Sequence, residues 1–191
     1  MGLHLEKITY LIASDLHGSA TYTEELLEAY DRERADRLLL LGDLLYHGPR
    51  NDLPEGYAPK KVAELLNLRR GEILSVRGNC EAEVDQMMLN FPVLAEYCLL
   101  ADGERTIFAT HGHIFNRDHL PPLKEGDVLL YGHTHIPLCE TVSGIVCMNP
   151  GSVSIPKENS PRGYMTLENG VFRWKTLAGE EYRTFDLNAL S

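Results

Sequence analysis

Short runs of apolar residues, many of them branched, recur along most of the chain. They span residues 8–13, 37–41, 73–76, 106–109, 128–131 and 145–148. Runs of this length suit strands that are buried on both faces. Two longer segments, 23–33 and 59–68, carry apolar residues at helical spacing; Ser19 is among the cap candidates before the first, and Pro59 opens the second. The alternation predicts an α/β core.

Helical spacing fades after about residue 135, and the rest of the chain is predicted to be mostly β. Strands are expected at 164–167, 171–176 and 182–187. Asn169 and Gly170 suit a tight turn between the first two of these. The chain contains no repeat and no linker-like segment, so we predict a single domain over residues 1–191. The longest segment without a regular pattern is 46–57, and a loop of that length in a compact domain is often functional, so we expect it beside the site.

Composition narrows the class of protein. The 191 residues are 43% hydrophobic and 24% charged, which is globular and excludes disorder and collagen. Lys and Arg number 18 against 28 Asp and Glu, for a net charge of −10, which argues against binding a nucleic acid polymer. The four cysteines form no CxxC pair, which favours a reducing, cytoplasmic setting. The apolar run 8–13 is too short for a membrane span or a signal peptide, so no membrane association is expected.

Five of the predicted strands end in a residue that can bind a metal. These are Asp15, Asp43, Asn79, His111 and His133. Ligand-type residues also stand two positions after Asp15 and His133, at His17 and His135, and residues i and i+2 of an extended segment point to the same side. A single histidine is more often a surface or core residue, but coincidence at five strand ends is improbable.

Seven candidates are too many for one cation and suit two divalent ions that share a carboxylate. Oxygen and imidazole ligands without thiolate favour manganese, iron or zinc in five- or six-coordinate sites, and not a structural tetrahedral zinc. The sequence therefore predicts a metal centre at the ends of the strands, where α/β folds place their sites.

The same residues give the chain a resemblance to the calcineurin-like metallophosphoesterases. The motifs that carry it are Asp15-Leu16-His17-Gly18, Gly42-Asp43, Gly78-Asn79-Cys80-Glu81, His111-Gly112-His113 and Gly132-His133-Thr134-His135. Within that family the chain is most similar to the YfcE-type bacterial and archaeal phosphodiesterases. Three further segments carry this likeness, namely 45–57, Val84-Asp85-Gln86 and 149–154. Together these segments extend the resemblance over nearly the whole chain.

The resemblance implies a fold, a metal centre and a reaction. The fold is a four-layer αββα sandwich, with two packed mixed β-sheets flanked by helices. One metal is implied to be held by Asp15, His17, Asp43 and His135, and the other by Asp43, Asn79, His111 and His133, so that Asp43 bridges. We expect two divalent ions, Mn²⁺ by preference, with Fe, Zn, Ni or Co also accepted. The reaction is hydrolysis of a small phosphodiester by bridging hydroxide, and Asp43, Asn79, Cys80 and His111 are the expected catalytic residues.

Cys80 departs from many relatives, in which this position is a histidine proposed to act as an acid or a substrate anchor. A thiol is a weak hydrogen-bond donor and presents no positive charge to phosphate. We hypothesise that Cys80 narrows the substrate range toward diesters with good leaving groups or with substrate-borne help. Cys80 as a buried spacer beside Asn79 is the alternative.

Four further residues are candidates for binding substrate. Arg50 and Asn51, in the long loop, could hold a phosphate oxygen, although Arg50 is equally suited to fixing the loop. His47 and His113 could line the pocket, and His113 has no ligand role by resemblance. We interpret the neighbouring Glu81 as a cap for the segment after Ala82.

Other functions stay open at this stage. The same fold serves as a non-catalytic scaffold in membrane-trafficking complexes, but all seven ligand positions are filled here, which favours catalysis. A nuclease would need a basic track, and Cys80 weighs against a phosphomonoesterase or protein phosphatase. A homo-oligomer is conceivable, since Trp174 and the predicted hairpin 171–187 could offer an apolar edge.

Overall fold

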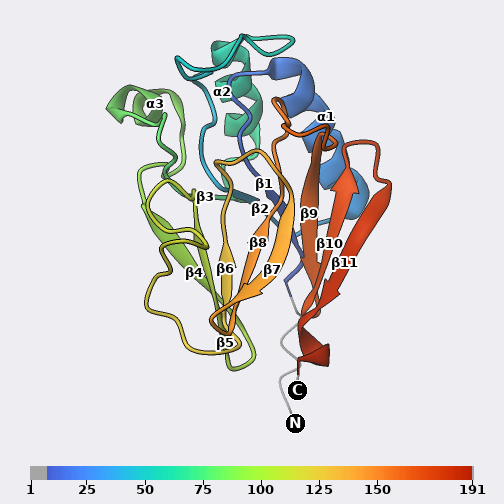
Figure 1. Ribbon diagram of the computed structural model, residues 1–191. Helices are drawn as coiled ribbons and strands as arrows, with labels where there is room; N and C mark the ends of the chain where they lie inside the picture. Colours follow the sequence, from blue (N-terminus) through green and yellow to red (C-terminus); the bar gives the residue numbers. More distant parts are fainter. Residues whose placement is uncertain (1–7, 191) are drawn as a thin grey trace.

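The computed structural model describes residues 8–190 and consists of two packed β-sheets with helices on one side (Figure 1). The first sheet has the order β11-β10-β9-β1-β2-β3 and the second β4-β5-β6-β8-β7. The strands of the first sheet are β1 (Tyr10–Ala13), β2 (Arg37–Leu40), β3 (Ile73–Ser75), β9 (Gly163–Glu168), β10 (Val171–Thr176) and β11 (Glu181–Asp186). Those of the second are β4 (Tyr97–Asp102), β5 (Arg105–Thr110), β6 (Val128–Leu130), β7 (Leu138–Val142) and β8 (Ile145–Asn149). The helices are α1 (Ala20–Glu33), α2 (Pro59–Leu68), α3 (Glu83–Met88) and the 3₁₀ turn η1 (Leu187–Ala189).

The predicted strands and helices are all present. The Ser19 side chain caps α1 by accepting a hydrogen bond from Tyr22 N at 3.3 Å, and Pro59 occupies the first turn of α2. Asn169 and Gly170 have φ of 52° and 77°, as the tight turn between β9 and β10 requires. β4, β7 and α3 were not predicted.

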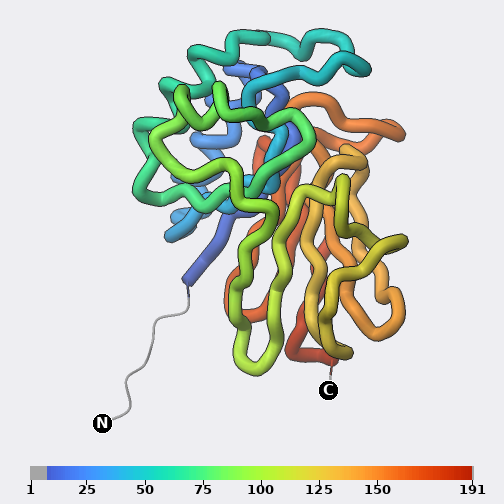
Figure 2. Tube along the Cα trace, turned by 90° about the vertical axis from the view of Figure 1, so that its left-hand side faces the viewer, coloured from blue at the N-terminus to red at the C-terminus, as the bar shows by residue number. Residues whose placement is uncertain are grey.

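The two sheets enclose one core, which includes Ile12 and Leu39 of the first sheet and Val146 of the second. A second core lies between the first sheet and helices α1 and α2. The outer face of the second sheet is covered by the irregular segment 112–127, which packs Phe115 against Phe108 with ring centroids 5.7 Å apart. The architecture is therefore the expected four-layer sandwich, and an irregular segment forms its fourth layer (Figures 1 and 2).

Trp174 is fully buried in the core between the sheets, where its Nε1–H donates to the carbonyl of Asn149 at 2.8 Å. The expectation that this indole contributes to an exposed apolar edge was wrong. A period-two strand pattern does not reveal which of its two faces is turned inward, and here Trp174 is on the inner face.

The ends of the strands determine where chemistry can occur. β1, β2 and β3 are parallel neighbours in one sheet, and β5 and β6 are parallel neighbours in the other. Their carboxyl ends meet at the same rim of the sandwich, at the upper end of the molecule in Figure 1, and the segment 46–57 lies at this end as well. Within residues 8–190, no helix combines the length and the apolar character needed to cross a membrane.

Candidate metal centre

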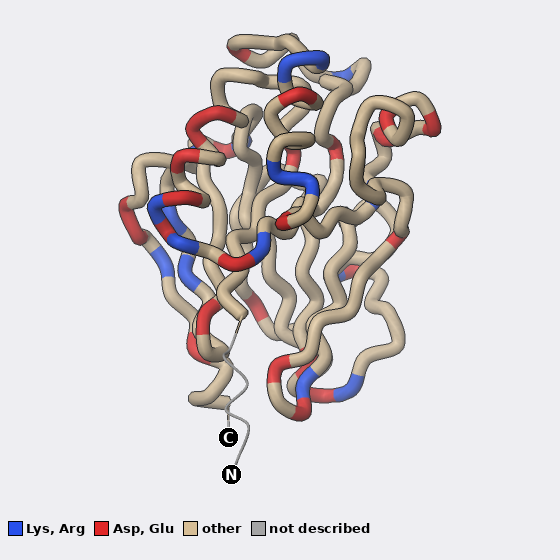
Figure 3. Tube along the Cα trace, turned by 180° about the vertical axis from the view of Figure 1, so that it is seen from behind, with Lys and Arg blue, Asp and Glu red and all other residues tan. Residues whose placement is uncertain are grey.

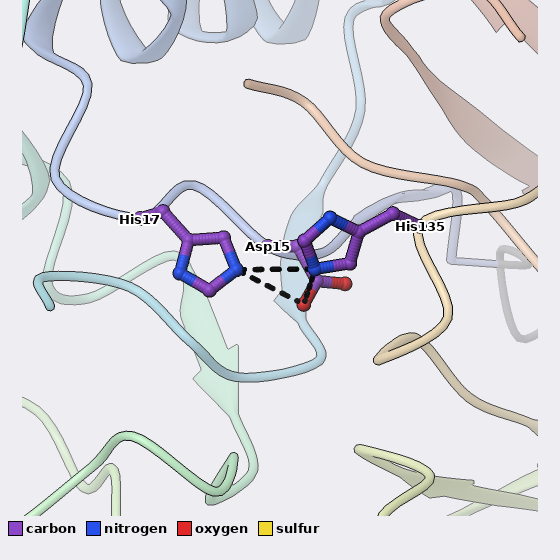
Figure 4. Close-up of side chains that lie close together, drawn as sticks. All are labelled: Asp15, His17 and His135. Atoms are coloured by element: carbon purple, nitrogen blue, oxygen red, sulfur yellow. Dashed lines mark hydrogen bonds and ion pairs between the residues drawn. The ribbon is translucent and has the colours of Figure 1, made fainter. Parts of the chain in front are cut away.

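Three buried side chains, Asp15, His17 and His135, converge where β1 and β6 end, and we call them the Asp15 group (Figure 4). Asp15 Oδ1 lies 3.2 Å from His135 Nε2 and 3.6 Å from His17 Nε2, and the two imidazole nitrogens are 3.2 Å apart. All three residues are at most 3% exposed. Asp15 Oδ2 accepts the His133 N–H at 3.0 Å, whereas the buried Oδ1 has no conventional hydrogen-bond partner among the described residues.

The imidazoles are oriented by backbone carbonyls. His17 Nδ1 lies 2.8 Å from the carbonyl of Tyr46, and His135 Nδ1 lies 2.7 Å from that of Ile155. A carbonyl only accepts, so each Nδ1 carries the hydrogen, and in the neutral ring Nε2 is left with a lone pair. Two such lone pairs and the unpartnered Asp15 oxygen face one another, which is a set of donor atoms suited to a cation.

A second set of side chains, Asn79, His111 and His133, lies beside the first, and we call it the Asn79 group. His111 Nε2 is 3.1 Å from Asn79 Oδ1 and 3.3 Å from His133 Nδ1, and His111 Nδ1 is held by the carbonyl of Leu41 at 2.7 Å. This group is more open than the first: His111 is fully buried, but His133 is half-buried and Asn79 is exposed.

Asp43 lies between the two groups. Its Oδ2 is 3.7 Å from His17 Nε2 and 3.5 Å from His111 Nε2, while its Oδ1 accepts the backbone N–H of Cys80 at 2.9 Å. One carboxylate oxygen therefore faces both groups, and the other is fixed to the loop after β3. All seven residues singled out from the sequence are thus brought together at one rim.

The charges of these side chains favour a cation as well. Burial by itself would raise the pKa of Asp15, but the imidazoles of His135 and His17 hold that pKa well below its ordinary value. Burial opposes ionisation of His111 too, yet Asp43 and Asp15 raise its pKa to about 9. Burial and the neighbouring His111 lower the pKa of His133 to about 4. Without a metal, a proton on His111 offsets part of the carboxylate charge.

Most of these residues have a left-handed backbone, with φ between 47° and 66°. They are Asp15, His17, Asp43, His133 and His135. This conformation disfavours residues with a Cβ, and such strain clusters at functional sites. Backbone hydrogen bonds maintain it: Asp15 N donates to the carbonyl of Gly42 at 3.1 Å, and His17 N to that of Asp43 at 2.9 Å.

Glu81 fastens the loops that carry Asp43 and Asn79. Its buried carboxylate accepts backbone N–H groups from Asp43 at 2.9 Å, Leu44 at 2.7 Å and Gly78 at 2.5 Å. The interpretation of Glu81 as a helix cap was wrong, because Asp85 Oδ2 accepts the Ala82 N–H at 2.7 Å instead. No local pattern signals the role of Glu81, since two of its three partners, Asp43 and Leu44, belong to the loop after β2, far away in the sequence.

The turn after β8 supports the opposite side of the rim. Asn149 Nδ2 donates to the carbonyl of Gly132 at 2.7 Å, just before His133. The hydroxyls of Ser152 and Ser154 both donate to the carbonyl of Asp15, at 2.8 and 3.0 Å. The segment 149–155 therefore positions both ends of the Asp15 group.

A cavity of about 390 Å³ opens over Asp43 between the two groups. Arg50 and Asn51 line it, and so does Lys157, which no sequence signal had indicated. Asn51 Nδ2 donates to the carbonyl of His47 at 2.9 Å, so this side chain also fixes its own loop. Arg50 is exposed and makes no ion pair within the described chain.

The remaining candidates lie at the margins of this cavity. His47 packs between Tyr46 and Tyr57 with edge-to-face ring contacts and does not line the cavity. His113 is exposed, with its ring centroid 5.5 Å from that of His111. Cys80 lines the cavity and accepts a hydrogen bond from Asn79 Nδ2 at 3.3 Å. Burial and the Asp43 carboxylate raise the pKa of its thiol, so Cys80 stays protonated at neutral pH.

The chain belongs to the calcineurin-like phosphoesterase superfamily, whose domain model matches residues 8–170. It is 51% identical over 161 residues to the phosphodiesterase YfcE of Escherichia coli K12, a match that covers 84% of this chain and 88% of that protein. The solved structure of E. coli YfcE, described as a phosphoesterase, superposes with a TM-score of 0.91 at 46% identity and covers 95% of this chain and all of that one.

The chain is also similar to two more distant proteins, one by sequence and one by structure. The probable metallophosphoesterase YsnB of Bacillus subtilis is 28% identical over 182 residues, which cover 90% of this chain and 92% of that protein. The Vps29 structure of Entamoeba histolytica, solved with Zn²⁺, has a TM-score of 0.58 at 21% identity, over 95% of this chain and all of that one. At that identity the second likeness concerns the fold alone.

Proposed function

We propose that this protein is a metal-dependent phosphodiesterase that hydrolyses small phosphodiesters with two divalent ions. The Asp15 group would hold one ion, the Asn79 group the other, and Asp43 would be shared. One observation carries the proposal: lone-pair donors converge from two sheets around Asp43, and the buried Asp15 Oδ1 among them has no hydrogen-bond partner within the described chain. Two divalent ions would activate a water for attack on phosphorus and offset the charge that develops there.

The donor set indicates which metals the centre would accept. The donors are carboxylate and amide oxygens and imidazole nitrogens, which suit Mn²⁺, Fe, Zn²⁺, Ni²⁺ or Co²⁺, and we propose Mn²⁺ as the preferred ion. Cys80 Sγ also lies near His17 and Asp43. We propose no ligand role for this thiol, because oxygen and imidazole donors already make up both groups.

The side chains of the cavity would bind and orient the phosphoryl group. Arg50 and Lys157 bring positive charge to its rim, and an arginine can contact two phosphate oxygens at once. Asn79 and His133, on the open side, would lie closest to an incoming substrate. No separate protein base is needed where metal ions lower the pKa of a water toward 7.

A small substrate suits the distribution of charge. The net charge is −10, and acidic and basic positions are interspersed over the side of the molecule seen in Figure 3. A polymer of phosphates would favour a continuous basic surface. The 51% identity to a protein named as a phosphodiesterase supports diesters as the substrate class.

The test combines metal content with substrate preference. Protein stripped of metal is restored separately with Mn²⁺, Zn²⁺, Ni²⁺, Fe²⁺ or Mg²⁺ and assayed on bis(p-nitrophenyl) phosphate and on p-nitrophenyl phosphate. We expect hydrolysis that depends on metal, prefers the diester and is absent from the His111→Ala variant. A protein that binds no metal, or that prefers the monoester, would contradict the proposal.

A further inference from the structure

A second cavity, also of about 390 Å³, adjoins the one over Asp43. It lies between the start of α2, the start of the loop 45–57 and helix α3, and most of its lining is apolar, including Leu45, Tyr46, Tyr57, Val84 and Met88. We call it the apolar cleft. Asp85 also borders it, but this carboxylate is buried and accepts the Ala82 N–H. The charged group left at its margin is Lys60.

The apolar cleft and the cavity over Asp43 share one wall residue, Cys80. Its thiol accepts a hydrogen bond from Asn79 and so lies directly beside the Asn79 group. A thiol is small and weakly polar, so it leaves an apolar boundary between the two cavities where an imidazole would be larger and polar.

A second connection runs through Tyr46. Its carbonyl orients His17 at 2.8 Å, and its ring lines the apolar cleft. Tyr57, on the same wall, packs so closely on Gly18 that a Cβ added there would lie 2.6 Å from the Tyr57 ring. The apolar cleft is therefore built onto the loop that carries Asp15 and His17 and is held at a fixed distance from it.

Apolar side chains around this cleft are left in contact with water. Val84 is 62% exposed, and Met88 and Tyr46 are each 42% exposed. Large apolar side chains gathered around a concave site beside a polar centre are typical of a ligand pocket. The adjoining metal centre would bind the phosphate of a diester, but it offers no site for the ester groups.

We propose that the apolar cleft binds an apolar ester group of the substrate, so that the enzyme prefers phosphodiesters with aromatic or alkyl ester groups. This inference rests on the proposed function and adds the substrate class. Cys80, Val84 and Met88 would then determine specificity. The phosphate of a diester carries a single negative charge whatever its ester groups are, so a preference within a series of diesters reports on the apolar cleft alone.

Dimethyl, dibutyl and diphenyl phosphate are the probes, and their binding to Mn²⁺-loaded protein is measured by calorimetry, which requires no turnover. Each methylene moved out of water is worth about 0.8 kcal/mol, or about a fourfold change in affinity. We expect dibutyl and diphenyl phosphate to bind at least about tenfold more tightly than dimethyl phosphate.

Three variants test whether that preference comes from the apolar cleft. Val84→Asn and Met88→Ala should remove most of it while leaving the affinity for dimethyl phosphate unchanged, because neither replacement adds a charge near the phosphate. Met87→Ala is the matched control, because Met87 belongs to the same helix, is 83% exposed and does not line the apolar cleft. Equal binding of the three probes by the unmodified protein, or a preference that persists in both cleft variants, would overturn the inference.

Two further measurements separate the competing outcomes. Hydrolysis of bis(p-nitrophenyl) phosphate is assayed in parallel. A protein that does not hydrolyse this diester, but still binds the apolar probes more tightly through the cleft, would contradict the proposed function and support the apolar cleft as a binding site. Light scattering tests whether a second copy of the chain fills the apolar cleft. An oligomer that Val84→Asn dissociates, with no preference among the probes, would assign this surface to self-association and overturn the inference.

Discussion

The Asp15 group and the Asn79 group use similar side chains in different surroundings. The three members of the first are buried, and its two imidazoles are each tied to a backbone carbonyl. In the second, Asn79 is exposed and His133 is half-buried. Burial with fixed orientation favours tight and slowly exchanging metal binding, and exposure favours access for substrate. The comparison suggests that the first group would retain its ion while the second would meet the substrate.

The largest effect is expected from Asp43→Asn, which alters the residue that faces both groups. An amide has one oxygen and no charge, so we expect both ions to bind weakly. Hydrolysis of the diester should fall by more than the roughly 10- to 100-fold that loss of an outer-shell partner costs. Metal content after dialysis, measured by elemental analysis, checks the cause. Retention of both ions would remove Asp43 from its shared role.

Two histidine variants test the difference between the groups directly. We expect His133→Ala to keep the ion of the Asp15 group during dialysis against a weak chelator, and His135→Ala to lose it. Activity should fall in both, because the reaction needs both ions. Equal metal loss from the two variants would contradict the comparison, and thermal unfolding verifies that each variant is folded.

Glu81→Gln tests the support beneath the Asn79 side of the centre. Glutamine keeps one acceptor oxygen and turns an NH₂ toward backbone N–H groups, so we expect a loss of about 1–3 kcal/mol in the free energy of unfolding. Urea denaturation measures it. Glu83→Gln, two positions along and exposed, is the control and should change stability little. An equal effect in the two variants would show that the three backbone contacts contribute little.

The last prediction concerns the dependence of stability on pH in the metal-free protein. The pKa of His111 is raised to about 9, so its contribution to stability is complete below its unfolded pKa of 6.5 and is lost as the pH rises through about 9. The pKa of His17 is raised in the same direction. We therefore expect the free energy of unfolding, measured with a chelator present, to fall between pH 6.5 and 9. His111→Gln should reduce that fall, and an unchanged slope would contradict the assignment.

The positions of the seven candidate ligands could be predicted because each follows an apolar run, and parallel strands bring such ends to one edge of each sheet. The roles of Glu81 and Lys157 could not, because both depend on which loops become neighbours. Helix α3 has only six residues, too few to show a helical period. The edge strand β4 alternates exposed and half-buried residues, and its inner face is defined only by pairing with β5.

The order in which sheets and helices pack into layers could not be predicted from the hydrophobic pattern either. An apolar run such as 128–131 is buried on both sides, but the sequence does not say whether a sheet, a helix or a loop covers each face. The resemblance to a known family supplied the two packed sheets. The absence of a helix from segment 112–127 emerged only from the coordinates of that described segment.

The left-handed backbone at five of the seven candidate ligands limits which residues can replace them during evolution. Glycine adopts that conformation without a steric penalty, so a glycine at any of these positions would relieve local strain and remove a ligand at the same time. A descendant released from catalysis would therefore be expected to accumulate glycine at these five positions before other positions. Such replacements in the sequence of a related protein would indicate that its enzymatic activity has been lost, before any assay is made.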